Sequence, residues 1–370
     1  MVVAGLLPFA SLAEGAEAAQ RVAPNSRAEA TAIVAEMRRI VTPQGVERLE
    51  KVHIGGIDQW VSVRGFDRRN PILLFIHGGP GFPMMPTSWY FGRGWEEYFT
   101  VVHWDQRGAG KTYLAHDPKA IAPTLTQERM IADAEAMIAW LRQEFGKDKI
   151  FVLGHSWGSF LGIQIAQRRP EWLHGYIGMG QVTHAMESER RGWAFAMQRA
   201  RAAENAKAIR ELQSIAPYAQ EGTTPPWKSI ELQRKWLTFY GGAVRGRTRF
   251  DHEIVGTALS PEYTDEEVRR IWEGSDFSES RLLEGALTVD FSNVSTLRCP
   301  MVLFNGRDDY NVSASLAAEW FERLTAPSKK LVWFERSAHD IVNEEPGAVL
   351  VSLVRDVRPI AERAGDIAPQ

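Results

Sequence analysis

Ser156 lies in a pentapeptide that is typical of an activated serine nucleophile. Residues 154–158 read Gly-His-Ser-Trp-Gly, which fits the pattern Gly-x-Ser-x-Gly. The mostly apolar residues 149–153 before it are typical of a short strand, and residues 159–169 after it have helical spacing. The pattern predicts a tight strand-to-helix turn that presents the serine at a helix N-terminus, where amide N–H groups favour negative charge. The pentapeptide alone would also fit an ordinary strand, loop and helix, so other segments of the chain must distinguish the two.

A glycine-rich loop follows another predicted strand and can stabilise an oxyanion. Residues 71–76 form a continuous apolar run, typical of a buried strand, and residues 77–81 after it read His-Gly-Gly-Pro-Gly. Glycines at such a place allow the backbone to approach a ligand closely. Where a serine attacks a carbonyl from this kind of turn, the loop supplies one N–H and the residue after the serine supplies the other. The predicted donors are Gly79, with Gly78 as the alternative, and Trp157.

An acid and a histidine each follow a further predicted strand. One strand-like run precedes a turn that contains Asp308 and Asp309, and another precedes His339. Because the carboxyl ends of parallel strands meet at one edge of a sheet, we expect these side chains close to Ser156. The serine can then give its proton to the imidazole of His339, which a carboxylate orients. The usual turn spacing, counted from Gly306, favours Asp309 as that acid, with Asp308 as the alternative.

Residues 110–112, Gly-Lys-Thr, resemble the end of a phosphate-binding loop. The complete pattern needs a glycine at position 105, and this chain has Asp105 there. A nucleotide site is therefore excluded at this loop. We expect Asp105 and Arg107 to hold the loop in place through hydrogen bonds, which is a structural role.

Three motifs together resemble the proline iminopeptidase group of α/β-hydrolases. They are residues 77–81, residues 104–110 (Trp-Asp-Gln-Arg-Gly-Ala-Gly) and residues 154–159, and the resemblance spans residues 45–180 and 296–356. It implies an α/β-hydrolase fold, which is an α/β fold with a mainly parallel sheet, helices on both faces and an inserted helical cap. Many relatives with these motifs cleave esters or other acyl bonds. The resemblance implies a catalytic triad of Ser156, Asp309 and His339, with Gly79 and Trp157 as the oxyanion donors.

The resemblance is incomplete at one position of the predicted cap. In proline iminopeptidases, a stretch of the form Trp-x-x-Trp-Glu-Gly carries a glutamate that holds the free amino group of the substrate. The counterpart here, residues 236–241, reads Trp-Leu-Thr-Phe-Tyr-Gly, with Tyr240 in place of the carboxylate. A neutral phenol cannot pair with an ammonium group as a carboxylate does. Glu273, in a Trp-Glu-Gly triplet farther along the chain, is a displaced counterpart. The predicted pocket residues are Trp236, Phe239, Tyr240 and Glu273.

These features predict a serine hydrolase that cleaves a small ester or amide with an apolar acyl part through an acyl-enzyme. Its expected partner molecules are small-molecule esters, amides or short peptides. The alternative is a true proline iminopeptidase, which removes N-terminal proline from peptides. A third interpretation is a non-catalytic ligand receptor on the same scaffold. Haloalkane and epoxide hydrolysis are disfavoured, because they need an aspartate nucleophile where Ser156 stands.

The chain divides into three predicted parts. Residues 1–44 form an N-terminal extension with helical spacing around residues 26–40. Strand-like and helical stretches alternate in residues 45–180 and again in residues 296–370, as the crossovers of a mainly parallel sheet require. Residues 181–295 lack this alternation, and we expect them to form a helical cap over the site.

The predicted cap contains helical stretches, such as residues 190–212 and 264–272, and many aromatic residues. Caps of this kind face the nucleophile, so some of these aromatic side chains should contact substrate. We expect two or three of them to do so, because most aromatic residues of a cap belong to its own core. The candidates are Trp193, Phe195, Trp227, Trp236, Phe239 and Tyr240.

Composition narrows the class of protein. The chain has 370 residues, of which 44% are hydrophobic, so it can bury a large core. Its net charge of -3 and the lack of basic runs interleaved with aromatic residues give no basis for binding nucleic acid. Cys299 is the single cysteine, which excludes an internal disulfide and a cysteine-based metal site. No His-x-x-x-His spacing with an adjacent glutamate occurs, and we expect neither a catalytic metal nor a cofactor.

The first residues have some features of a secretory signal. Residues 1–13 are mostly apolar, and residues 16–18, Ala-Glu-Ala, fit the small-x-small pattern of a cleavage site. A positively charged start is missing, so the alternative is an amphipathic N-terminal helix of a cytoplasmic protein. The signal-like interpretation predicts a periplasmic or secreted protein. The apolar run is too short to span a bilayer, and no other segment is a candidate for a membrane span.

Overall fold

The computed structural model describes residues 24–369, so the signal-like segment 1–18 lies outside the described residues. Within them, eight strands form one sheet in the order β1-β2-β4-β3-β5-β6-β7-β8. The strands β1 and β2 pair antiparallel, as do β2 and β4, and all other pairs are parallel. The mainly parallel sheet predicted from the alternation is confirmed. The strands are β1 (Val46–Ile54), β2 (Ile57–Gly65), β3 (Ile72–Ile76), β4 (Thr100–Trp104), β5 (Ile150–His155), β6 (Leu173–Met179), β7 (Met301–Gly306) and β8 (Lys329–Phe334).

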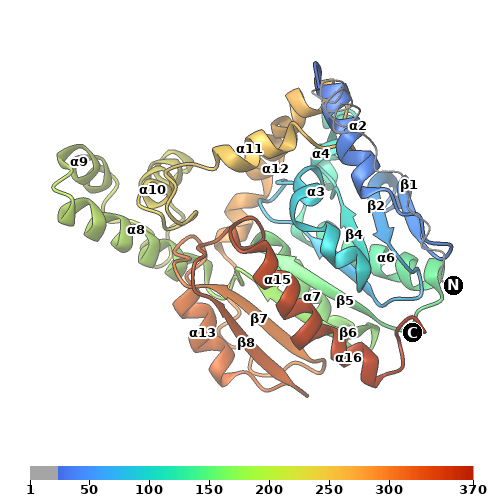
Figure 1. The fold of residues 1–370 in the computed structure, drawn as a ribbon. Helices are drawn as coiled ribbons and strands as arrows, with labels where there is room; N and C mark the ends of the chain where they lie inside the picture. The colour runs from blue at the N-terminus through green and yellow to red at the C-terminus, as the bar shows by residue number, and fades with distance from the viewer. Residues whose placement is uncertain (1–23, 370) are drawn as a thin grey trace, which may run out of the picture.

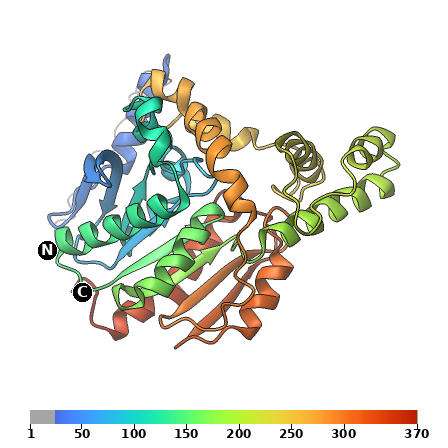
Figure 2. The ribbon, with the colours of Figure 1, turned by 180° about the vertical axis from the view of Figure 1, so that it is seen from behind.

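Helices cover both faces of the sheet (Figures 1 and 2), which explains why the central strands are continuous apolar runs. The side chains of strand β3 point alternately to the two faces of the sheet. Its residues Ile72, Leu74 and Ile76 belong to the hydrophobic cluster under α6 (Gln127–Phe145), α7 (Trp157–Arg168) and α13 (Ala314–Arg323). Its residues Leu73 and Phe75 belong to the cluster on the opposite face. That cluster packs under α3 (Ser88–Phe91), η2 (Arg93–Glu97), α14 (Ile341–Glu344), α15 (Pro346–Ser352), η5 (Leu353–Val357) and α16 (Arg358–Arg363).

Cys299 lies in the first of these clusters, just before β7, and is buried. Burial raises the pKa of its thiol to about 12. The thiol is therefore protonated at neutral pH.

The segment predicted as a cap lies between β6 and β7. Its helices are α8 (Ala185–Ala202), α9 (Ala206–Ser214), α10 (Trp227–Phe239), α11 (Asp251–Thr257) and α12 (Asp265–Leu287). Figures 1 and 2 both show α8, α9 and α10 projecting beyond the sheet. These three helices share a hydrophobic cluster of their own, centred on Phe195, Trp236 and Leu237. The long helix α12 instead packs against α4 (Gly110–Leu114), next to the sheet.

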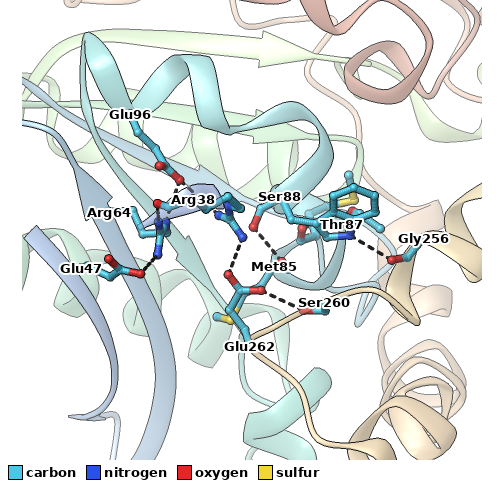
Figure 3. A network of polar contacts seen from close by, with 12 residues as sticks. Arg38, Glu47, Arg64, Met85, Thr87, Ser88, Glu96, Gly256, Ser260 and Glu262 are labelled. Atoms are coloured by element: carbon cyan, nitrogen blue, oxygen red, sulfur yellow. Dashed lines mark hydrogen bonds and ion pairs between the residues drawn. The ribbon is translucent and has the colours of Figure 1, made fainter. Parts of the chain in front are cut away.

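The N-terminal helix α2 (Arg27–Arg38) joins the sheet to the segment between α11 and α12 (Figure 3). The buried guanidinium of Arg38 contacts Glu96 at 3.2 Å and Glu262 at 2.7 Å. Arg64 of β2 donates to the same Glu96 at 2.8 Å. Arg27 donates to the backbone carbonyls of residues 258, 260 and 263. The N-terminal extension is thus tied to both the sheet and the cap. No helix within residues 24–369 combines the length and the apolar character needed to cross a bilayer.

Candidate active site

Ser156 occupies the sharp turn between β5 and α7. Its backbone has φ 54° and ψ -121°, a conformation that is strained for any residue with a Cβ. Glycines on both sides make this turn sterically possible. A Cβ on Gly158 would overlap the backbone at the end of β3, and a Cβ on Gly154 would lie 2.8 Å from the carbonyl carbon of Gly158. The sequence pattern therefore corresponds to a real packing requirement, and the serine side chain points out of the sheet edge into a cavity.

The glycine loop after β3 passes directly beside this serine. A Cβ on Gly78 would lie 2.9 Å from the Cβ of Ser156, so only glycine allows this approach. The loop is held from the neighbouring β4 side, because the Gln106 side chain donates to the carbonyl of His77 at 3.0 Å. Gly79, with φ 108°, lines the cavity together with Trp157, the residue after the serine. The structure thus brings the two predicted oxyanion donors to the cavity that contains Ser156.

His339 lies in the loop after β8 and also lines this cavity. Its Nδ1 is 2.8 Å from Oδ2 of Asp309, in the loop after β7. The other carboxylate oxygen of Asp309 accepts backbone N–H groups of Asn311 and Val312, each at 2.9 Å. Burial alone would raise the pKa of Asp309, but the His339 ring and these N–H groups hold it below its ordinary value. The carboxylate is therefore ionised and fixed on one side of the imidazole.

The neighbouring Asp308 faces elsewhere. It is half-exposed and pairs with Arg245, whose Nε lies 3.1 Å from Oδ2 of Asp308. Of the two aspartates left open by the sequence, the structure therefore places Asp309 against the histidine.

His155 is a neighbour of the site that sequence reasoning did not single out. Its ring lies 4.8 Å from the ring of His339, and its Nε2 donates to the backbone carbonyl of His339 at 3.0 Å. Burial lowers the pKa of His155 to about 3, so the ring is neutral. Its hydrogen bond to the backbone holds the loop that carries His339. The only sequence signal was its position next to the serine.

Asp105 and Arg107 have the structural role expected of them. Asp105 accepts the backbone N–H of Lys111 at 2.7 Å and the hydroxyl of Tyr263 from the cap. The Nε of Arg107 donates to Asp133 on α6 at 2.8 Å. The loop after β4 is therefore fixed on both sides.

The cavity above Ser156 has a volume of about 1140 Å³ and is walled mainly by apolar side chains of the core loops and the cap. Three of the six candidate aromatic residues line it, namely Trp227, Trp236 and Phe239. Other aromatic and aliphatic lining residues were not predicted individually, because they come from both the cap and the core loops. Among them are Phe82, Phe160, Ile230, Phe250, Trp272 and Leu283.

Two predicted pocket residues lie outside the cavity lining, and this corrects the sequence interpretation. Tyr240 packs in the cluster of α8 to α10, with its ring stacked 6.1 Å from that of Trp236. Glu273 lies on the outer face of α12, where it is 45% exposed and pairs with Arg270 at 2.9 Å. Trp193 and Phe195 also belong to the cap cluster rather than to the lining.

Other carboxylates line the cavity instead. Glu279 of α12 and Glu231 of α10 are both part of its lining. Burial and the charge of Asp276 raise the pKa of Glu279 to about 7, against the opposing effect of Arg234, with a further increase from Glu231. A cation bound beside Glu279 would therefore stabilise its ionised form.

Glu253 of α11 and Asp340 also line the cavity, beside His339. Burial raises the pKa of Glu253 well above its ordinary range, and the charges of Asp340 and Glu344 raise it further. This end of the cavity therefore brings two carboxyl groups close together, and burial favours the protonated form of Glu253. Within residues 24–369, no three His, Cys, Asp or Glu side chains are grouped so that they could hold a metal ion.

Comparison with known proteins identifies the family of this chain. Residues 71–346 match the family described as alpha/beta hydrolase fold. The chain belongs to this family. The hydrolase fold with a mainly parallel sheet, which the motifs implied, is therefore confirmed.

Similar proteins place this hydrolase near the proline iminopeptidases. It is 30% identical to the probable aminopeptidase YbaC of Bacillus subtilis (strain 168), over 316 residues that cover 84% of this chain and 96% of that protein. It is 35% identical to the proline iminopeptidase of Neisseria gonorrhoeae over 108 residues, which cover 29% of this chain and 32% of that enzyme. The solved proline iminopeptidase of Mycobacterium smegmatis has the same fold, with a TM-score of 0.61 and 18% identity over 86% of this chain and all of that one. The predicted resemblance to the proline iminopeptidase group is confirmed.

Proposed function

We propose that this hydrolase cleaves a carboxylic ester or amide through a covalent acyl-enzyme. The supporting observation is that Ser156, on its strained turn, shares one cavity with His339, whose ring is held by Asp309 at 2.8 Å. A serine is a weak nucleophile unless a base removes its proton, and an oriented imidazole is such a base.

The proposed reaction has two halves. Ser156 Oγ attacks the substrate carbonyl while His339 takes its proton, and Asp309 stabilises the imidazolium that forms. The backbone N–H groups of Gly79 and Trp157 donate hydrogen bonds to the oxyanion that develops on the carbonyl oxygen. His339 then gives the proton to the leaving alcohol or amine. A water molecule, deprotonated by His339, attacks the acyl carbon and releases the acid and the free serine.

The cavity supports an apolar acyl part in the substrate. Its walls carry side chains such as Phe160, Trp236 and Leu283, and they would bury apolar groups with little cost. A cavity of about 1140 Å³ leaves more room than a single prolyl group needs. We therefore take small esters and amides with apolar acyl groups as the leading substrate class.

A second candidate function is an aminopeptidase that accepts a free amino group, as in a proline iminopeptidase. The observation in its favour is the pair Glu231 and Glu279 on the cavity wall, which could replace the carboxylate expected at position 240. The relative from Bacillus subtilis, named a probable aminopeptidase, also favours it. An ammonium that enters an apolar cavity needs such an anion, because it otherwise loses its hydration without return.

The first experiment tests the nucleophile. Ser156→Ala should lower kcat on p-nitrophenyl esters by about 10⁴-fold or more, the usual cost of losing a nucleophile. The wild type should release a burst of p-nitrophenol equal to the enzyme concentration, since acylation by an activated ester is fast. Turnover near the wild-type rate in Ser156→Ala, with host esterases excluded, would refute the mechanism. Binding without a burst or turnover would instead indicate a receptor.

The second experiment separates the two substrate classes. Prolyl and N-acetyl-prolyl derivatives of one leaving group differ only in the free amine. A preference for the free amine above about tenfold in kcat/KM, roughly 1.4 kcal/mol, would establish the aminopeptidase. In that case Glu279→Gln should abolish the preference, and Glu273→Gln, outside the cavity, should keep it. Equal or better cleavage of the blocked substrate would establish the esterase-like function.

A further inference from the structure

Two buried serines of the cap helix α12 bond to loops of the core. Ser275 and Ser278 are one helical turn apart, on the same face of α12, and are 6% and 1% exposed. Ser275 Oγ donates to the carbonyl of Gly81 at 2.8 Å, and Ser278 Oγ donates to the carbonyl of Gly108 at 2.8 Å. A serine within a helix more often bonds to its own backbone, as Ser280 does with Phe277.

The helix and the two loops also touch backbone to backbone. A Cβ on Gly81 would lie 2.7 Å from the Cβ of Ser278 and 3.0 Å from the carbonyl oxygen of Gly274. A Cβ on Gly274 would in turn lie 2.9 Å from the carbonyl oxygen of Gly108. Glycines thus stand on both sides of the contact. This packing leaves α12 little freedom to shift while the loops stay in place.

Further contacts, in the first turn of α12 and in the segment before it, also hold this helix to the core. Lys111 of α4 pairs with Glu267 at 2.6 Å, and Tyr263 donates its hydroxyl to Asp105. Glu262 binds Arg38 of the N-terminal helix (Figure 3). By contrast, α8 to α10 pack mainly on one another. The cap therefore consists of a fixed helix and a separate group of three helices.

One of the two supported loops carries the proposed oxyanion donor. Gly81 is two residues from Gly79, in the loop whose other end is held by Gln106. Gly108 is two residues from Gln106, in the loop after β4. The Ser275 hydroxyl therefore bonds to the oxyanion loop itself. The Ser278 hydroxyl bonds to the loop that carries Gln106, and the Ser278 Cβ packs beside Gly81 of the oxyanion loop.

We infer that α12 is the support of the oxyanion loop, and that Ser275 and Ser278 are positioning residues for the hydrolysis. Each hydroxyl fixes a loop carbonyl, and the loop in turn aims the N–H of Gly79 at the substrate carbonyl. This inference rests on the acyl-enzyme mechanism proposed above. It assigns to part of the cap a role in transition-state stabilisation in addition to enclosing the substrate.

The test compares Ser275→Ala and Ser278→Ala with Ser280→Ala, a control on the exposed face of the same helix. Loss of an oxyanion donor costs about 10²–10³ in kcat, and we expect a misplaced donor to cost about tenfold, largest in Ser275→Ala. KM should stay within about twofold, since substrate binding does not need the oxyanion contact. Ser280→Ala should match the wild type.

Three further measurements distinguish positioning from a general loss of fold. Rates are referred to active sites counted by the acylation burst, so unfolded protein does not enter. Binding of a trifluoromethyl ketone, which forms an oxyanion on the serine, should weaken by the same factor as kcat/KM. Ser275→Thr, which keeps the hydroxyl, should regain most of the rate.

Each failure has a separate meaning. Retained turnover in Ser156→Ala would refute the proposed function. An inactive Ser156→Ala together with kcat per active site unchanged in Ser275→Ala and Ser278→Ala would refute the supporting role alone. A change confined to KM or to melting temperature would also overturn it, because it would show an effect on binding or on folding only.

Discussion

At the scale of single residues, the two adjacent aspartates after β7 give the sharpest comparison. Asp309→Asn should lower kcat by roughly 10⁴-fold, because an amide favours the wrong tautomer of His339 and leaves its charged form unpaired. Asp308→Asn should change kcat by less than about tenfold, since Asp308 is half-exposed and contacts Arg245. Steady-state kinetics on one p-nitrophenyl ester checks both. The reverse ranking would assign the orienting role to Asp308.

The raised pKa of Glu279 predicts that the stability of the protein depends on pH. Its pKa is about 7 in the folded protein, above the ordinary value of a glutamate. Between that ordinary value and about 7, the folded protein holds a proton that the unfolded chain has lost, so stability falls as pH rises through this window. Glu279→Gln removes the loss, and its free energy of unfolding relative to wild type should rise between about pH 5 and about pH 8, by no more than about 3 kcal/mol.

Urea unfolding at both pH values measures this difference. Glu273→Gln is the matched control, because Glu273 lies on the outer face of the same helix beside Arg270. An equal pH response in the two variants would contradict the burial of the Glu279 carboxyl. A confirmed response would also show that this carboxyl can change charge near neutral pH, where a substrate amine would need it ionised.

The residues that the sequence could locate are those whose role is local. Ser156 is positioned by the glycines two residues before and after it, so a short pattern identifies it. Glu273 was chosen by its neighbours in the sequence, and α12 turns it outward. Glu279, six residues later, lies about 120° around the helix and faces the cavity. Which face of a cap helix turns inward depends on packing against distant segments, which a single sequence does not reveal.

At the scale of elements, the turn between β5 and α7 depends on Gly158, whose surroundings leave no room for a side chain. Gly158→Ala would place a methyl group against the backbone at the end of β3, less than 3 Å from the carbonyl of His77. We expect a loss of several kcal/mol in stability, or no soluble protein, because backbone atoms on a central strand cannot move aside. Thermal unfolding and the acylation burst measure the effect.

Gly347→Ala is the control for this prediction. Gly347 lies in α15, and a Cβ there would meet nothing within 4 Å. Alanine also favours helix over glycine by up to about 1 kcal/mol, so this variant should be as stable as the wild type or more stable. Equal behaviour of the two variants would mean that the turn is looser than the structure indicates.

The elements of the core were predictable and those of the cap were less so. Buried parallel strands are continuous apolar runs, so the segments before residues 77, 154 and 306 could be recognised. The helical stretch expected at residues 190–212 is two helices, α8 and α9. They are separated at Glu204, which has φ 50°, and Asn205, which caps α9. An alanine-rich stretch continues across that break, so composition did not reveal it.

At the scale of the whole molecule, the N-terminal helix α2 should contribute to the stability of the cap. Arg38→Ala would leave Glu262 and Glu96 buried with a missing counter-charge (Figure 3). Breaking such a buried pair costs about 3–5 kcal/mol, and Arg64 should keep the loss toward the lower end because it still binds Glu96. We expect lower stability in urea and faster proteolysis between α11 and α12.

Arg39→Ala provides the comparison. Arg39 is 61% exposed and pairs with Glu36 on the surface, a contact worth less than about 1 kcal/mol. If the two variants had the same stability, the N-terminal extension would be an accessory to the fold rather than a brace between sheet and cap.

The burial of the single cysteine makes this chain suitable for site-specific labelling. Maleimides react with thiolates, and Cys299 is buried with a thiol pKa of about 12, so the unaltered protein should take up no dye at neutral pH. Cysteines introduced at the exposed positions Gln213 on α9 and Asp148 beside β5 would then carry the only two fluorophores. Energy transfer between them would report directly, in solution and during turnover, whether α9 moves relative to the sheet.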